Sequence, residues 1–328
     1  MIRGYVAQGN RLVAADLNEV PLRAMAWIDL EAPTVADEDA VEAALGIEIP
    51  TREDMAEIEP SSRIYFENGV LYLTAQILAS RVANDPRELD IAPVTFMLQR
   101  DRLVTVHYHH PGSFGFFADW AARHDTGCET GAGTFLGLME SVVDRLADIL
   151  EGEARRLDYL SKTIFEAHRP DGKAETLTVV LQRIGKAEDQ NGKVGESLAT
   201  IQRLLGFLST PAVQGAKEAL KKMERDQLKS LVHDVRSLRE VAQVQAEKIR
   251  FQLDATLGVI NIRQSDIIKV FSVVAFVFLP PTLIASIYGM NFEYMPELKW
   301  PWGYPLALFM MLISAVVPWM IFRWKKWL

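Results

Sequence analysis

The sequence contains almost no cysteine and no motif typical of an enzyme. Cys128 is the only cysteine among 328 residues, so one chain cannot form an internal disulfide, and we expect a reducing cytoplasm around most of the protein. The stretch from Gly185 to Val194 resembles a phosphate-binding loop, but six residues separate its glycines and Val194 replaces the required Ser or Thr. We therefore expect no enzyme. The net charge of −8 argues against nucleic acid as a partner and favours cations.

Long apolar runs are missing from the first 266 residues and occur twice after them. Val270 to Tyr288 and Tyr304 to Phe322 carry no charge. At about 1.5 Å per helical residue, each run nearly covers the roughly 30 Å of a bilayer core. Since the connection between them is short, we predict a transmembrane hairpin. No basic and then apolar signal peptide opens the chain, so we expect these spans to direct membrane insertion.

The distribution of cations predicts the orientation of this hairpin. Arg263 and Lys269 precede the first run, while Arg323, Lys325 and Lys326 follow the second. The connecting loop holds Glu293 and Glu297 against the single cation Lys299. The positive-inside rule then places both termini in the cytoplasm and the loop outside. We predict a multi-pass membrane protein, with the lipid bilayer as a partner.

Residues 1–130 have the pattern of a cytoplasmic α/β domain. Short alternating runs predict strands, and the intervening segments predict helices, the second opened by Thr51 with Asp54 three residues on. Asn68-Gly69 is the strongest hairpin signal, because both residues tolerate positive φ. We expect one sheet with helices against it. The predicted strands are Ile2–Val6, Met25–Leu30, Arg63–Glu67, Val70–Leu78, Pro93–Gln99 and Leu103–His107, and the predicted helices are Val35–Leu45 and Thr51–Ile58.

Residues 131–266 read as a cytoplasmic stalk of long helices, and residues 267–328 as a two-helix transmembrane domain. Breaks at Pro170-Asp171-Gly172 and Ser209-Thr210-Pro211 separate helices predicted at Thr134–Ala167, Ala174–Leu208 and Gln214–Tyr288. The predicted fold class is therefore an α+β membrane protein: an α/β sandwich, a helical stalk bundle and two C-terminal spans. The third helix carries apolar residues at helical spacing, which we expect to pack against the other two: Leu228, Leu231, Val235, Leu238, Val241, Val244 and Ile249.

Three short motifs at the end of the chain resemble those of one family. They are Tyr288-Gly289-Met290-Asn291 after the first span, Met295-Pro296-Glu297-Leu298 in the loop, and Lys325-Lys326-Trp327-Leu328. Together they are similar to the CorA family of divalent-cation channels. The resemblance implies a homopentamer of the inner (cytoplasmic) membrane that admits hydrated Mg²⁺ passively. It also implies Co²⁺ and Ni²⁺ as alternative substrates, and closure when intracellular Mg²⁺ binds between cytoplasmic domains. Two alternatives remain: a Zn²⁺ transporter of the ZntB kind, and a membrane-anchored structural or sensing protein.

The residue types around the first span suit a path for a hydrated ion. Mg²⁺ gives up its water reluctantly, so a neutral carboxamide that accepts hydrogen bonds from that water suits a selective mouth. We predict Asn291, framed by Gly289 and Met290, as the ion-selectivity residue. Glu293 and Glu297 either concentrate cations at the outer loop or are simply solvated. Candidates for the pore lining and gate lie upstream, with the apolar ones expected to constrict the path: Asn261, Ser265, Ile268, Phe271, Ser272, Leu279 and Thr282.

The resemblance also implies a regulatory Mg²⁺ site between subunits, which we assign to Asp54 and Asp234. The alternative for Asp54 is a residue favoured at a helix N-terminus by the helix dipole. An acidic row on another helix can be read either as a solvated face or as an attractor for cations: Glu140, Asp144, Asp148 and Glu151. For the histidine cluster after the last strand, His107, His109 and His110, we favour a strand-end surface over a transition-metal site.

Overall fold

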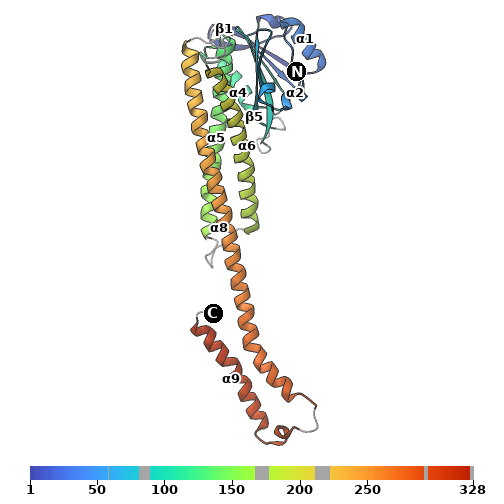
Figure 1. Ribbon diagram of the computed structural model, residues 1–328, viewed down its shortest axis with the longest axis vertical. Helices are drawn as coiled ribbons and strands as arrows, with labels where there is room; N and C mark the ends of the chain where they lie inside the picture. Colours follow the sequence, from blue (N-terminus) through green and yellow to red (C-terminus); the bar gives the residue numbers. More distant parts are fainter. Residues whose placement is uncertain (58, 81–88, 167–176, 211–221, 292–294, 326–328) are drawn as a thin grey trace. The chain divides into compact units, whose positions relative to one another are not determined.

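A computed structural model describes residues 1–57, 59–80, 89–166, 177–210, 222–291 and 295–325 (Figure 1). The chain divides into two compact units. One comprises residues 1–165 and 178–252, and the other includes residues 253–328. The division into three segments at residues 130 and 266 stays a prediction.

The first unit is built on a seven-stranded sheet in the order β2-β1-β3-β7-β6-β5-β4. Neighbouring strands are antiparallel except for β3 and β7, which are parallel. The strands predicted from sequence are all present, while β2 was missed because it is short and buries only Leu12 fully. The strands are β1 (Ile2–Gln8), β2 (Arg11–Ala15), β3 (Trp27–Glu31), β4 (Ile64–Glu67), β5 (Val70–Ser80), β6 (Leu89–Leu98) and β7 (Leu103–His107).

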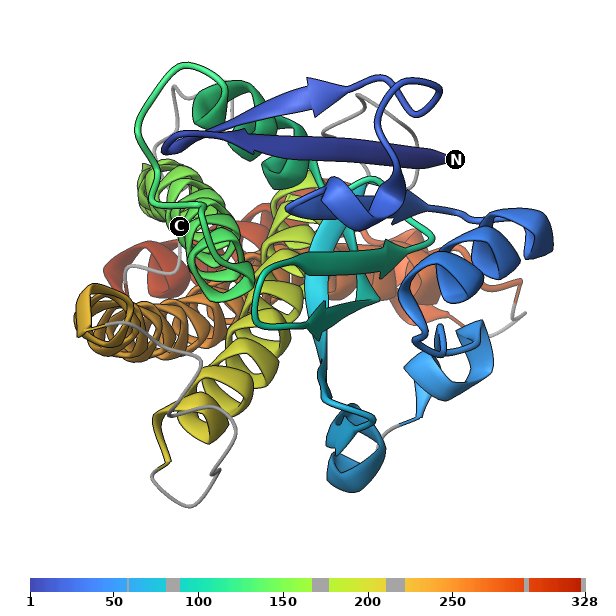
Figure 2. The ribbon, with the colours of Figure 1, turned by 90° about the horizontal axis from the view of Figure 1, so that it is seen from above.

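Both faces of the sheet are covered, so alternate residues of each strand enter different cores. On one face Ile28 and Val104 pack with Val41 of α1 (Val35–Leu45) and Met55 of α2 (Arg52–Ala56). The other face has a second core, made by strand residues such as Trp27 and by α4 (Gly112–Ala121) together with the long helices. Figure 2 shows α1 and α2 on one side of the sheet and α5 and α6 on the other. The expected sandwich is thus observed.

Local turn and cap signals fold as the sequence predicts. Asn68 and Gly69 have φ of 49° and 82°, and they join β4 to β5 as a hairpin. Thr51 caps α2, since its Oγ1 accepts a hydrogen bond from the Asp54 backbone N–H at 3.2 Å. This helix ends at Ala56, earlier than predicted. Sequence patterns did not indicate the short elements η1 (Leu22–Ala24) and α3 (Pro60–Arg63), nor α4.

Three long helices follow: α5 (Gly131–Glu166), α6 (Leu177–Ser209) and α8 (Lys222–Tyr288). Within the first unit they lie side by side (Figure 1). The helices themselves were predicted, although the predicted limits at residues 167, 174 and 214 fall outside the described residues. Their buried positions alternate by three and four residues, as in a coiled coil. On α6 these positions are Val180, Ile184, Ala187, Asn191, Val194, Leu198, Ile201, Leu205 and Leu208.

The stripe predicted on α8 is right at both of its ends and wrong at two positions between them. Val241 and Val244 are 43% and 64% exposed, whereas Ala242 and Gln245 take the buried positions at 4% and 6%. The seam follows heptad geometry, and the next buried position is Ile249. Hydrophobicity alone therefore selected the wrong pair of residues.

Buried amides fix how α8 pairs with α5. Gln245 Nε2 donates to the Leu150 carbonyl at 2.9 Å, and Gln252 Nε2 donates to the Leu157 carbonyl at 2.7 Å. From the first contact to the second, the residue number rises by seven on both helices, which is one heptad. The two helices therefore run parallel. On α6, Asn191 Nδ2 donates to the Ala242 carbonyl at 3.0 Å. These contacts set the register of the bundle.

In the second unit, α8 continues through Pro280 and Pro281 to Tyr288. The short η2 (Pro296–Lys299) and then α9 (Gly303–Trp324) follow. Among the described residues, α8 and α9 are long and apolar enough to cross a membrane, by length and composition. The rings of Phe276 and Phe322 lie 5.9 Å apart, so the two helices meet.

Candidate functional site

The Gly-Met-Asn motif lies immediately after the last turn of α8. The Gly289 backbone N–H donates to the Ala285 carbonyl at 2.9 Å, and that of Met290 to the Ile287 carbonyl at 3.2 Å. Gly289 does not have positive φ. A Cβ added there would lie 3.2 Å from the Ala285 carbonyl oxygen, which is tighter than an ordinary contact. Gly289 continues the last helical turn through its hydrogen bond to Ala285, so this contact alone does not require glycine at the position.

Asn291 offers an exposed carboxamide just beyond this helix end. Its side chain forms no hydrogen bond with any other residue that the structure describes. A carboxamide carries a neutral acceptor and two donors, so it can bind a water shell without a net charge. Of the two acidic loop residues, Glu293 lies outside the described residues and Glu297 belongs to η2.

The residues predicted to line a path share an uncovered face of α8. At 100° per residue they fall within about a third of the helix circumference. The apolar members are open, with Ile268 56%, Phe271 71% and Leu279 68% exposed. The polar members Asn261, Ser265 and Thr282 are exposed too, and Ser272 is half-buried.

A shallow hollow of about 430 Å³ lies on the same face. It is lined by Ala275, Phe278, Leu279, Thr282, Leu283 and Ser286. The Thr282 hydroxyl donates to the Phe278 carbonyl at 2.6 Å, so its proton is held by the helix and its lone pairs remain available. Helix α9 covers a different side, where Val273 is 5% exposed and Ala307 4%. The face with the candidate residues is thus left open to another molecule.

Asp54 and Asp234 do not meet within one chain. Asp54 accepts hydrogen bonds at Oδ2 from the Thr51 N–H at 3.0 Å and the Thr51 hydroxyl at 2.7 Å, as a residue of a capping box. It lies on α2, whose Met55 packs on one face of the sheet. Asp234 is exposed on α8, and its neighbour Val235 belongs to the core on the other face. A metal ion shared by these two carboxylates would need two copies of the chain.

The structure instead brings Asp234 close to the acidic row on α5. Burial raises the pKa of Asp144, and the charges of Glu140, Asp148 and Asp234 raise it further. All four residues of the row are exposed, as on a solvated face, and the row lies close enough to Asp234 on α8 for the two sets of charges to interact. Sequence reasoning treated the two groups separately, since 90 positions separate Asp144 from Asp234. Among the described residues, no three His, Cys, Asp or Glu side chains are grouped so that they could hold a metal ion.

The expected strand-end surface is wrong for His107, which is only 2% exposed, whereas His109 and His110 are half-buried. Its Nε2 lies 2.9 Å from Asp29 Oδ1, which also accepts a hydrogen bond from the Thr105 hydroxyl at 2.6 Å. The Trp27 indole N–H donates to that hydroxyl at 3.0 Å. A buried polar network therefore joins β3 to β7. The sequence signal for it is Asp29, which lies between the apolar residues Ile28 and Leu30 in the strand.

Comparison with known proteins identifies the relationship. The family described as CorA-like Mg²⁺ transporter protein matches residues 23–326. The magnesium transport protein CorA of Escherichia coli K12 is 32% identical over 329 residues, covering all of both chains. The solved CorA magnesium transporter of Methanocaldococcus jannaschii superposes with a TM-score of 0.77 at 17% identity, covering 100% of this chain and 99% of that one.

A more distant likeness exists to the cytoplasmic domain of ZntB from Vibrio parahaemolyticus, with a TM-score of 0.54 at 10% identity. It covers 79% of this chain and 97% of that domain, and at this identity it shows a shared fold alone. The family match, by contrast, extends through both predicted spans. The predicted α+β membrane fold is confirmed, and the matched family consists of ion transporters, not enzymes. The chain belongs to the CorA-like Mg²⁺ transporter family.

Proposed function

We propose that copies of this chain form a passive path for hydrated Mg²⁺ into the cytoplasm across the inner membrane, with both termini inside. The observation that carries the proposal is the exposed, neutral Asn291 carboxamide at the end of an apolar span in a chain of this family. An inside-negative potential supplies about 2.3 kcal/mol per elementary charge per 100 mV, and a divalent ion gains about twice that. Influx therefore needs no nucleotide hydrolysis.

Asn291 is proposed to recognise the ion through its water. Mg²⁺ demands near-octahedral oxygen geometry and dehydrates slowly, so a carboxylate at this position would hold the ion too firmly for rapid passage. A ring of neutral amide oxygens can accept hydrogen bonds from the water shell and release it. Gly289 and Met290 hold the ring in place at the helix end. Glu293 and Glu297 would raise the local cation concentration on the outer loop.

Several copies are required, because one hairpin encloses nothing. The uncovered face of α8 supplies the surface that would turn toward a common axis, and the family resemblance favours five copies. Apolar rings of Ile268, Phe271 and Leu279 would then form the gate by excluding water. Asn261, Ser265, Ser272 and Thr282 would provide polar levels between them.

Closure is proposed to follow binding of intracellular Mg²⁺ between Asp54 of one copy and Asp234 of the next. In one chain, Asp54 lies on a helix that packs on one face of the sheet and Asp234 on a helix that packs on the other, so an ion that they share would join two copies. The nearby Asp144 adds negative charge on the α8 side. A bound ion would stabilise the arrangement in which it is shared.

Mg²⁺ is proposed as the main substrate, with Co²⁺ and Ni²⁺ as alternative substrates. A Zn²⁺ transporter of the ZntB kind has weaker support, since the likeness to that protein is one of fold, whereas the likeness to the E. coli magnesium transport protein extends over the full chain. A membrane anchor without transport activity also has weaker support, because the family that matches the chain is described as a Mg²⁺ transporter.

The test is Mg²⁺ uptake into proteoliposomes with an imposed inside-negative potential, in competition with Co²⁺ and Zn²⁺. We expect uptake that Co²⁺ inhibits more strongly than Zn²⁺, and a loss of at least tenfold in Asn291→Ala. Ser314→Ala on α9 is the matched control and should keep full uptake. Full uptake by correctly assembled Asn291→Ala would contradict the proposed recognition, and absence of uptake by the unaltered chain would contradict transport itself.

A further inference from the structure

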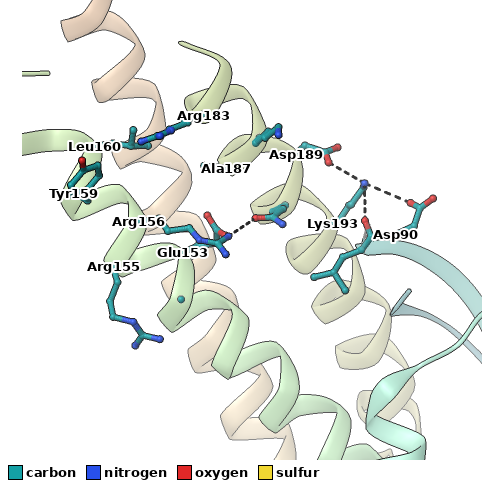
Figure 3. Close-up of a pocket in the computed structure, with 14 residues that line it drawn as sticks. Asp90, Glu153, Arg155, Arg156, Tyr159, Leu160, Arg183, Ala187, Asp189 and Lys193 are labelled. Carbon is teal, nitrogen blue, oxygen red and sulfur yellow. Dashed lines mark hydrogen bonds and ion pairs between the residues drawn. The ribbon is translucent and has the colours of Figure 1, made fainter. Parts of the chain in front are cut away.

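Two cations that line the large pocket of the first unit lie beside carboxylates. The pocket has a volume of about 1220 Å³ and is lined by residues of α5 and α6 (Figure 3). Lys193 Nζ lies 3.0 Å from Asp189, and Arg156 forms an ion pair with Glu153. The charges of these side chains are therefore already compensated. At the end of α9, by contrast, two cations lack such a partner.

Arg323 and Lys325 carry this uncompensated charge. Neither side chain forms an ion pair or a hydrogen bond with any residue that the structure describes. Helix α9 contains no Asp or Glu, so its own turns offer no counter-charge. On α8 the arrangement is different, since Lys269 Nζ lies 3.0 Å from Asp266 Oδ1. The end of α9 thus presents two positive charges to its surroundings.

The Arg323 guanidinium is held back over the apolar part of its own helix. Its Cζ lies 5.3 Å from the centre of the Trp319 ring, about one turn nearer the middle of the span. A long cationic side chain at the end of a span normally extends toward water, because burying its charge in hydrocarbon is costly. A guanidinium that lies back along the span therefore favours an anionic partner at the same depth. Contact with the ring face leaves the N–H donors at the guanidinium edge available for a phosphate.

The apolar run of α8 extends past the end of α9. The rings of Phe276 and Phe322 lie 5.9 Å apart, so the two helices are level at these residues. The uncharged run of α8 begins at Val270, six residues or about 9 Å before Phe276. Arg323 directly follows Phe322, so its charge lies beside a part of α8 that is still apolar, where Phe271 is 71% exposed. This is the depth of lipid headgroups and not of bulk water.

An uncovered apolar face leads from Arg323 toward the middle of the span. Trp319, Val316 and Leu312 follow at steps of four, three and four residues, so they share one face of α9. They are 42%, 38% and 62% exposed, so α8 does not cover them. Trp324, next to Arg323, is 83% exposed and has the side chain typical of a membrane interface. A charged end that continues into an apolar face matches the shape and chemistry of a phospholipid.

We propose that the end of α9 binds an anionic phospholipid, with its headgroup phosphate on Arg323 and Lys325 and an acyl chain along Trp319, Val316 and Leu312. A basic residue near an anionic lipid surface strengthens the attraction by about fivefold, and no carboxylate of α9 opposes it. The binding requires that α9 spans the membrane, but it does not depend on the proposed ion path. A failure of Mg²⁺ uptake and a failure of lipid binding can therefore be told apart.

The test is native mass spectrometry of the detergent-solubilised full chain, titrated with phosphatidylglycerol or with phosphatidylcholine of the same acyl chains. Arg323→Gln with Lys325→Gln removes both proposed contacts to the phosphate. Lys269→Gln with Lys299→Gln removes two cations from other parts of the same unit and is the matched control. Arg323→Gln alone keeps Lys325, so it tests the site if the double variant does not fold.

We expect phosphatidylglycerol to bind the unaltered chain at least about fivefold more tightly than phosphatidylcholine. This preference should disappear in the double variant, fall at least about twofold in Arg323→Gln and stay unchanged in the control. Inorganic phosphate should not displace the lipid, because it has no acyl chain.

The proposal is overturned if the unaltered chain shows no preference for phosphatidylglycerol, or if the preference survives in the folded double variant. Where that variant does not fold, an unchanged preference in Arg323→Gln overturns the proposal. Displacement of the lipid by inorganic phosphate, or an equal loss of preference in the control, would also overturn it.

Discussion

Replacing Asp29 by Asn should strongly destabilise the sheet-containing unit. Asp29 is 1% exposed and accepts hydrogen bonds from Thr105 and His107, with Arg3 Nη1 3.9 Å from its second oxygen. The other ring nitrogen of His107, Nδ1, lies 2.6 Å from the His109 carbonyl oxygen. Both neighbours of the ring are acceptors, so both ring nitrogens carry protons. The pair is therefore a buried imidazolium and carboxylate.

The magnitude follows from removing one partner of this pair. A buried charge left without its partner costs roughly 3–5 kcal/mol, far more than the net contribution of one hydrogen bond. For a unit of this size, each kcal/mol shifts the unfolding midpoint by about 2–4 °C. Asp29→Asn should thus lower the midpoint by roughly 10 °C. Asp125→Asn, which removes an exposed carboxylate 3.3 Å from Arg11, should change stability by less than about 1 kcal/mol.

The loss of stability caused by Asp29→Asn should become smaller as the pH rises. Burial lowers the pKa of His107, but the hydrogen bond and charge of Asp29 more than offset it, so the pKa is raised above 6.5. A raised pKa in the folded state gives stability that is fully present below pH 6.5 and is lost as the pH rises through the raised value. Glu31 adds to this shift, and the ring of Phe114 packs against the imidazole at 5.2 Å.

Thermal unfolding of the detergent-solubilised chain, followed by far-UV circular dichroism from about pH 5.5 to about pH 9, measures both effects. The difference in unfolding midpoint between the unaltered protein and Asp29→Asn should become smaller as the pH rises. If this difference grows with pH, or if Asp29→Asn lowers the midpoint no more than Asp125→Asn does, His107 and Asp29 do not form a charged pair.

Three further predictions concern stability, measured by the same unfolding assay. Gln245→Leu should lower the free energy of unfolding by less than about 1 kcal/mol or raise it, because the amide oxygen of Gln245 is buried without a hydrogen bond among the described residues. Gln245→Ala should lower it by about 1–3 kcal/mol, because it leaves a cavity. Equal losses of stability in the two variants would contradict this reasoning. Gly131→Ala should cost more than about 2 kcal/mol, since its Cβ would lie 2.2 Å from the Arg102 carbonyl oxygen, and a neutral result would contradict the close approach. Gly185→Ala should stabilise by about 0.5–1 kcal/mol, because nothing lies within 4 Å, and a destabilised variant would show a contact that the structure lacks.

Much of the fold could be predicted because many of its elements are determined by residues that are close together in the sequence. The Asn68-Gly69 hairpin and the Thr51 cap depend on only a few neighbouring residues, and uncharged runs reveal the spans directly. The seam of α8 was harder, since Val241 is apolar but exposed, and Gln245 is polar but buried. Which side of a helix is covered depends on its partners, and hydrophobicity does not encode those partners.

The candidate site also has a part that the sequence predicts and parts that depend on packing or on another copy of the chain. Gly289 to Asn291 is a contiguous motif, so its place at the end of a span was predictable. Asp54 is tied up in a capping box and its proposed partner would come from another copy, which no pattern within one chain can reveal. The pocket between α5 and α6 is lined by residues of both helices, such as Gly152 and Ala187, and their proximity emerges only when the register of the helices is known.

The parallel pairing of α5 with α8 restricts how this bundle can change in length. The chain must travel along α5 and return along α6 before α8 can start beside the beginning of α5, and those two helices have 36 and 33 residues. One residue inserted into the middle of α6 would turn every later buried position by about 100° away from the seam. Seven residues added to each of the three helices would instead keep Gln245 and its successors opposite α5 carbonyls. Viable insertions in the bundle should therefore come as matched heptads on all three helices at once.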